Sequence, residues 1–92
     1  MNDGLSLRTV VRDHAFQCAW DALGLDPKAS DEVLSAVEWA LGRDPVRAGQ
    51  PTLSGRVWAI PVDFAFEPRT ATIYYVFDDR VVRLVDVIFP DR

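Results

Sequence analysis

Arginine supplies every basic side chain in the second half of this chain. Residues 47–92 hold six acidic and six basic residues, and the bases are Arg47, Arg56, Arg69, Arg80, Arg83 and Arg92. The planar guanidinium group binds carboxylates and phosphates through paired hydrogen bonds. Arg56, Arg69 and Arg83, with Glu67 as a base, are therefore weak candidates for catalysis on a phosphate. The alternative is that these charges only solvate the surface of a strand-rich segment.

A second group of residues could bind a metal ion. His14, Cys18 and Asp21 recur at helical spacing, so one helix face could present all three side chains. A metal site usually has a fourth ligand and a stronger motif, and Cys18 lies next to Ala19 as a small core residue would. We therefore expect Cys18 to fill the core, and we expect neither a metal nor a cofactor.

Asp86 lies between Val85 and Val87 in a segment that is otherwise apolar. A carboxylate in such a strand either faces solvent or pairs with a cation. Arg56 and Arg83 are the candidate partners, and a cross-strand ion pair is the favoured interpretation because strands often use such pairs.

The bulk composition indicates one soluble globular domain that spans residues 1–92. The chain is 49% hydrophobic and 26% charged, with a net charge of −4. It has no apolar run of the roughly 20 residues that a membrane span needs, and its first residues lack a signal-peptide pattern. Because Cys18 is the single cysteine, it cannot form an internal disulfide, which agrees with a reducing compartment. We expect a cytoplasmic protein that does not bind membranes.

The first half of the sequence predicts one strand and two helices. The β-branched segment Leu5–Arg12 is typical of a strand. A change to helical periodicity follows, with Asp13 as the expected N-cap and Gly24 as the expected stop. Ser30 is the expected N-cap of a second helix, which ends at Gly42.

The second half predicts three strands. The first covers residues 56–64, where Pro61 indicates an edge position or a bulge because it has no N–H to donate. A loop around Pro68 follows. The segment Thr72–Phe89 then forms a hairpin that turns at Asp78-Asp79, and its apolar residues occupy both faces of the strands.

Two stretches of the sequence contain recognisable motifs. The stretch "LGRDPVRAGQPTLSGRVWAIPV" has two leucines, an Asp-Pro pair, two spaced glycines and a tryptophan: Leu41, Asp44, Pro45, Gly49, Leu53, Gly55 and Trp58. The closing stretch "YVFDDRVVRLVDVIF" has a tyrosine, a short acidic turn and an apolar last strand. In this order and spacing, the pattern resembles the RelE/ParE superfamily of bacterial type II toxins.

The resemblance implies an α+β fold with the order β-α-α-β-β-β. A small antiparallel twisted sheet would have two helices on one face, and its other face would be open. It also implies a toxin that a cognate antitoxin neutralises. Ribonuclease members of the superfamily cut messenger RNA on the ribosome, whereas ParE-type members are taken to bind DNA gyrase.

This chain departs from the ribonuclease members at the positions that matter for cleavage. Thr72 stands where those members usually have an arginine, and Phe89 lies near the position of their late His or Arg. The chain is also acidic, with a pI of about 4.7, which disfavours a phosphate-rich target. We therefore expect a toxin that acts by binding, without direct contact to DNA. A non-toxic interaction module of the same fold and an atypical ribosome-dependent endoribonuclease stay open as alternatives. The expected partner-binding residues are Arg56, Arg83, Asp86, Phe89 and Arg92.

Overall fold

The computed structural model describes residues 7–64 and 67–89, and of residues 67–69 it describes the backbone alone. Within these ranges the helices are α1 (His14–Ala22), α2 (Pro27–Arg43) and the one-turn α3 (Pro45–Ala48). The strands are β1 (Thr9–Arg12), β2 (Gln50–Pro51), β3 (Trp58–Phe64), β4 (Glu67–Phe77) and β5 (Val81–Ile88). The predicted α+β order is confirmed, with α3 and β2 as additions between the second helix and the second long strand.

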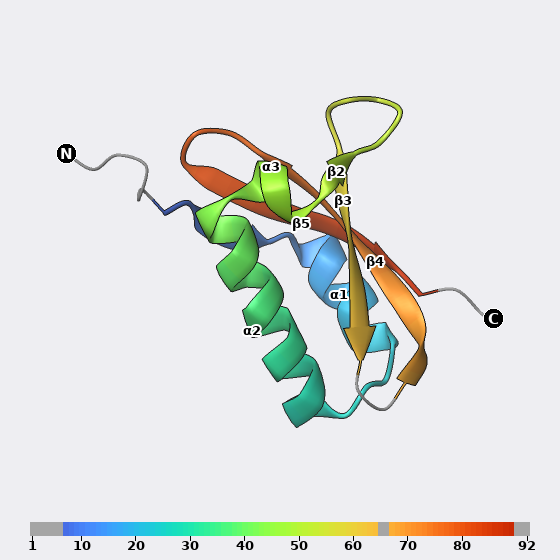
Figure 1. Cartoon of the computed structure of the whole chain (residues 1–92). Helices are drawn as coiled ribbons and strands as arrows, with labels where there is room; N and C mark the ends of the chain where they lie inside the picture. Colours follow the sequence, from blue (N-terminus) through green and yellow to red (C-terminus); the bar gives the residue numbers. More distant parts are fainter. Residues whose placement is uncertain (1–6, 65–66, 90–92) are drawn as a thin grey trace.

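The five strands form one sheet in the order β1-β5-β4-β3-β2 (Figure 1). The predicted hairpin is confirmed as β4 and β5, which pair antiparallel next to the centre of the sheet. The predicted antiparallel sheet is mixed, because β1 runs parallel to β5 while the other neighbours pair antiparallel. These two strands are separated by most of the chain, and a parallel pair requires such a long connection.

β4 is longer than predicted, because the segment around Pro68 is strand and not loop. Phe64 on β3 and Glu67 on β4 are partners in the ladder. β5 is paired with β4 only from Thr72 onward, so Pro68 lies beyond the end of that pairing. A proline is tolerated there because no ladder with β5 needs its missing N–H. Pro61 likewise lies past the end of β2, which confirms its predicted edge position.

The helix ends follow local capping chemistry. Asp13 and Gly24 flank α1 as predicted, and Gly24 has a φ of 69° that favours glycine. Ser30 is not the cap of α2, contrary to the prediction. Asp26 is the N-cap and its carboxylate accepts a 3.1 Å hydrogen bond from the amide of Ala29. Pro27 follows at the first helical position, where its fixed φ suits a helix start.

The two long helices bury their apolar faces against one face of the sheet. Aromatic rings from α1 meet the strands, since Phe16 stacks on Trp20 at 5.9 Å and Trp20 contacts Phe64 at 6.2 Å between centroids. The fully buried large side chains come from the three helices and the central strands: Phe16, Leu34, Leu41, Pro45, Ile73, Tyr75, Val82 and Leu84. No described helix is both long enough and apolar enough to cross a membrane.

Candidate functional site

The face of the sheet that points away from the helices is the candidate docking surface. Strand register sets three rows of neighbouring residues across it: Val11, Arg83 and Val76; Asp86, Tyr74 and Ala59; Ile88, Thr72 and Pro61. Their strand neighbours, such as Ile73, Tyr75 and Val82, are fully buried on the helix side. We call these nine residues, together with Asp63 on β3, the outer sheet face. None of the described helices covers it.

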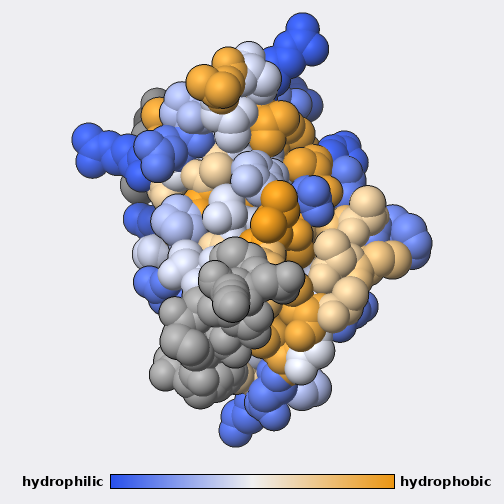
Figure 2. All heavy atoms as spheres, turned by 90° about the vertical axis from the view of Figure 1, so that its right-hand side faces the viewer, coloured by the Kyte–Doolittle hydropathy of each residue, from blue (hydrophilic) through white to orange (hydrophobic). Residues whose placement is uncertain are grey.

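The outer sheet face is partly apolar. Ile88 and Val11 are among the exposed large hydrophobic residues, and Tyr74 and Val76 are half-buried. Exposed apolar residues are not confined to this face, and Figure 2 shows a band of hydrophobic side chains that reaches the surface between hydrophilic ones. An apolar sheet face with no covering helix is a surface that another protein can bury.

A β-bulge explains the carboxylate of Asp86 in an apolar strand. Leu84 pairs with Tyr75 and Asp86 pairs with Tyr74, so Val85 is the extra residue of the bulge. Strict alternation after Leu84 would direct Asp86 into the core. The bulge shifts the alternation by one, so that Val87 is buried and Asp86 is exposed. Its face is open, which was one of the two predicted explanations.

Among the described residues, the predicted ion pair of Asp86 with Arg56 or Arg83 does not form. Arg83 instead donates to Asp13 at 2.9 Å, and this pair ties β5 to the end of β1. The carboxylate of Asp86 accepts from the amide of Val87 at 2.8 Å. The charges of the outer sheet face are therefore Arg83, already paired, together with the exposed carboxylates of Asp63 and Asp86.

Of the remaining predicted partner-binding residues, Arg56 and Phe89 lie within the described structure. Arg56 is exposed in the loop before β3, two residues before Trp58, which pairs with Tyr75. It is therefore at the same end of the sheet as Arg83. Phe89 follows β5 and its ring contacts Phe64 at 5.9 Å, so it packs against the core. Arg92 lies outside the described residues. The role of these residues in binding stays a prediction.

The four weak catalytic candidates are not brought together. Arg83 is opposite Val76, whereas Arg69 is seven residues earlier on β4, a distance of about 23 Å along an extended strand. Glu67 is at the same end of β4 as Arg69. Thr72 does lie in the row of Ile88, next to Phe89, so the positions that the resemblance assigns to catalysis are neighbours. Neither side chain can act as an acid or base near neutral pH.

The motif that carries the resemblance has a structural role here. Asp44 caps α3 by accepting from the amide of Arg47 at 3.2 Å, and Pro45 follows at the start of that helix. The hydroxyl of Tyr75 donates to the carbonyl oxygen of Pro45 at 2.6 Å in the core. Burial, reinforced by the charge of Asp44, raises the pKa of Tyr75 to about 12. A Cβ at Gly49 would clash with the Tyr75 hydroxyl and the Ala59 carbonyl, so only glycine fits there.

A short acidic turn completes the hairpin. The carboxylate of Asp78 accepts from the amides of Arg80 and Val81 at 2.8 and 2.9 Å. These two backbone hydrogen bonds lower the pKa of Asp78. Turn geometry thus explains Asp78, since aspartate side chains bond the backbone of tight turns.

The predicted place of Cys18 in the core is wrong, because the side chain is exposed. Its Sγ lies 3.5 Å from Nε2 of His14 one turn earlier on α1. Asp21 is engaged elsewhere, since its carboxylate accepts from Gln17. Within the described residues, no three His, Cys, Asp or Glu side chains are grouped so that they could hold a metal ion.

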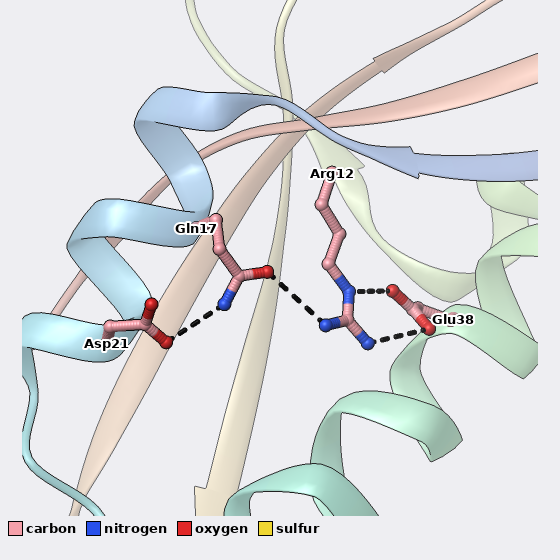
Figure 3. A network of polar contacts seen from close by, with 4 residues as sticks. All are labelled: Arg12, Gln17, Asp21 and Glu38. Carbon is pink, nitrogen blue, oxygen red and sulfur yellow. Dashed lines mark hydrogen bonds and ion pairs between the residues drawn. The ribbon is translucent and has the colours of Figure 1, made fainter.

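One polar network was not predicted from the sequence. Arg12 at the end of β1 binds Glu38 on α2 at 2.6 Å and Gln17 on α1 at 3.3 Å, and Gln17 continues to Asp21 (Figure 3). The hydrogen bond that Arg12 donates to the carboxylate of Glu38 raises the pKa of Arg12. A hollow of about 210 Å³ lies beside the network, between α1 and the start of α2. The contacts of Gln17 with Arg12 and Asp21 are local, whereas the Arg12–Glu38 contact spans 26 positions and no local pattern could have revealed it.

The sheet order, the two helices on one face and the open outer face define an α+β domain with a RelE-like fold. The fold matches a chain in the crystal structure of the toxin–antitoxin complex RelBE2 from Mycobacterium tuberculosis, with a TM-score of 0.69 and 19% sequence identity. The match covers 91% of this chain and 99% of that chain. At this identity the likeness establishes the fold and not the activity. No family model matches the sequence, and no curated protein does so either.

Proposed function

We propose that this chain is the toxin component of a two-protein toxin–antitoxin pair and that it acts by binding its cellular target. The observation that carries the proposal is the match to a toxin–antitoxin complex over nearly the full length of both chains. Such a toxin would act in the cytoplasm, and the targets that the resemblance suggests are DNA gyrase and the ribosome.

The residues favour binding over cleavage. The two positions that the resemblance assigns to phosphate chemistry are Thr72 and Phe89, which have no titratable group. The outer sheet face also presents two exposed carboxylates, Asp63 and Asp86, which form no salt bridge with a described residue and which repel a phosphate backbone. These carboxylates would not repel a protein partner whose contacting side chains are basic.

The cognate antitoxin is the proposed occupant of the outer sheet face. A segment that fits would place an apolar side chain over Ile88 and Tyr74 and a basic side chain opposite Asp86. The apolar contact supplies most of the binding free energy, whereas the charge contact selects the partner and its register. Arg56 and Arg83 lie at one end of this face and would meet the end of the bound segment.

Growth of a bacterial host tests the toxin assignment. Induced expression of this chain alone should slow growth, and co-expression with the product of an adjacent reading frame should restore it. An unrelated protein from the same plasmid serves as the control. Normal growth at confirmed soluble expression would contradict the toxin assignment and favour a non-toxic interaction module of the same fold.

Calorimetry with the purified adjacent-frame product tests the docking surface. Asp86→Lys should weaken binding by roughly 1–2 kcal/mol, because a favourable charge contact becomes repulsive. Asp31→Lys makes the same charge change on α2, away from the outer sheet face, and should leave the affinity unchanged. Equal affinities for both folded variants would show that the partner binds elsewhere.

A further inference from the structure

The solvent side of α2 carries four exposed residues in a helical stripe: Glu32, Ala36, Trp39 and Arg43. Their spacing of four, three and four residues places them in one row along the helix. α2 lies at the border of the molecule, with one side away from the sheet (Figure 1). We call this row the α2 stripe. It takes no part in the core or in the outer sheet face.

The centre of the stripe is a large apolar side chain in water. Trp39 is 67% exposed, although tryptophan is among the residues that lose most from exposure. The guanidinium group of Arg43 lies 4.7 Å from the centroid of its ring. This cation–π contact holds both side chains in place one turn apart, so little side-chain freedom would be lost when a partner covers them.

The charges at the two ends of the stripe are opposite and available. Within the described residues, neither Glu32 nor Arg43 forms a salt bridge. Each end charge is four residues from its central neighbour, Glu32 from Ala36 and Arg43 from Trp39. From either direction, the stripe therefore has a charged residue at its end and an uncharged residue four positions further in. The two ends differ in the sign of the charge, and the two central residues differ in size.

This pattern is complementary to itself under a two-fold rotation. If two α2 helices run antiparallel with Trp39 of one copy against Ala36 of the other, Glu32 of each copy lies against Arg43 of the other. The small side chain of Ala36 leaves room for the indole ring, and both ion pairs form at once. A contact of this kind is isologous and closes on itself, as the interfaces of symmetric dimers do.

We propose that the α2 stripe binds a second copy of this chain and forms an antiparallel, two-fold symmetric dimer. α2 has 17 residues, which corresponds to a length of about 25 Å. A single helix from each copy buries an area at the low end of the range for specific interfaces, so the dimer is a weak one that forms at micromolar or higher concentration. The inference rests on the α2 stripe and not on the proposed toxin function.

Sedimentation velocity over a concentration series tests the dimer. The full chain should shift from monomer to dimer as its concentration rises. Trp39→Ala and Arg43→Glu should each raise the dissociation constant about tenfold or more, because they remove the central anchor and reverse both ion pairs. Leu53→Ala, at an exposed apolar residue in the loop before β3, is the matched control and should have no effect.

A charge exchange identifies the antiparallel geometry. Glu32→Arg and Arg43→Glu should each dimerise poorly alone, since each creates like charges across the two-fold axis. An equimolar mixture of the two variants should form a heterodimer about as stable as the original dimer, because every cross-pair is again opposite in sign. Circular dichroism checks that each variant is folded. A chain that stays monomeric throughout, or a dimer that neither variant weakens, would overturn the proposal.

Discussion

Tyr75 shows how a single side chain can join a sequence motif to the fold. It is fully buried on β4, and its hydroxyl finds its acceptor in the Pro45 carbonyl, 30 positions away in the chain. Gly49 leaves the space in which the hydroxyl lies. The Asp-Pro pair, the glycine and the tyrosine therefore belong to one packing unit that fixes the connection between α2 and the sheet.

The raised pKa of Tyr75 predicts a loss of stability at alkaline pH. Folding favours the neutral phenol, whose pKa rises from 10.0 to about 12. The stabilisation is complete below pH 10 and is lost as the pH rises through about 12. Tyr75→Phe should cost about 1–3 kcal/mol at pH 8, because a buried carbonyl loses its donor, and should reduce the alkaline loss.

Urea unfolding at pH 8 and at pH 11 measures both effects. Tyr74→Phe is the matched control, since Tyr74 is half-buried on the outer sheet face and should retain the alkaline loss. An alkaline loss of the same size in Tyr75→Phe would refute this assignment.

At the scale of elements, the start of α2 is decided by a choice between two capping residues. Ser30 has the right residue type, but it lies inside the helix, where its hydroxyl donates to the carbonyl oxygen of Pro27 at 3.1 Å. Asp26 precedes Pro27, and the proline ring sets the first helical φ. An Asp-Pro pair thus begins α2, and the Asp44-Pro45 pair begins α3 in the same way.

Removal of the Asp26 cap should therefore destabilise the protein more than removal of the Ser30 hydroxyl. Asp26→Ala should lower the free energy of unfolding by about 1 kcal/mol, because the amide of Ala29 loses its acceptor. Ser30→Ala should cost less, since it removes a second bond to a carbonyl inside a formed helix. Chemical denaturation of both variants ranks them, and the reverse ranking would restore Ser30 as the cap.

At the scale of the whole molecule, the sheet holds apart charged residues that come from the same half of the sequence. Arg69 and Arg83 occupy opposite ends of the β4–β5 pair, and the rows of Thr72 with Ile88 and of Tyr74 with Asp86 lie between them. The net charge of −4 adds a repulsive term toward any nucleic acid. The molecule therefore lacks, among its described residues, a convergent set of groups for phosphate cleavage.

We accordingly predict that the purified protein does not cut messenger RNA on translating ribosomes. Primer extension on a translated message should show the same ends with and without the protein, whereas a known ribosome-dependent nuclease provides the positive control. Codon-phased cuts that disappear with Arg69→Ala would contradict this expectation and revive the endoribonuclease alternative.

Local signals in the sequence determined much of this protein. Helical periodicity and Gly24 defined α1, and the β-branched runs around Asp78 defined the central hairpin, because both depend on residues only a few positions apart. Pro61 indicated the sheet edge, because proline has no N–H to donate to a neighbouring strand whatever its sequence context.

Tertiary structure decided what depends on distant partners. β1 pairs parallel with β5, and Arg83 forms its ion pair with Asp13 and not with Asp86. Both contacts join residues from opposite ends of the chain. The bulge at Val85 exposes Asp86, and nothing in the alternation of β5 alone reveals that one extra residue. Strand register and long-range pairing depend on which face of the sheet is buried, and only the packed tertiary structure fixes that.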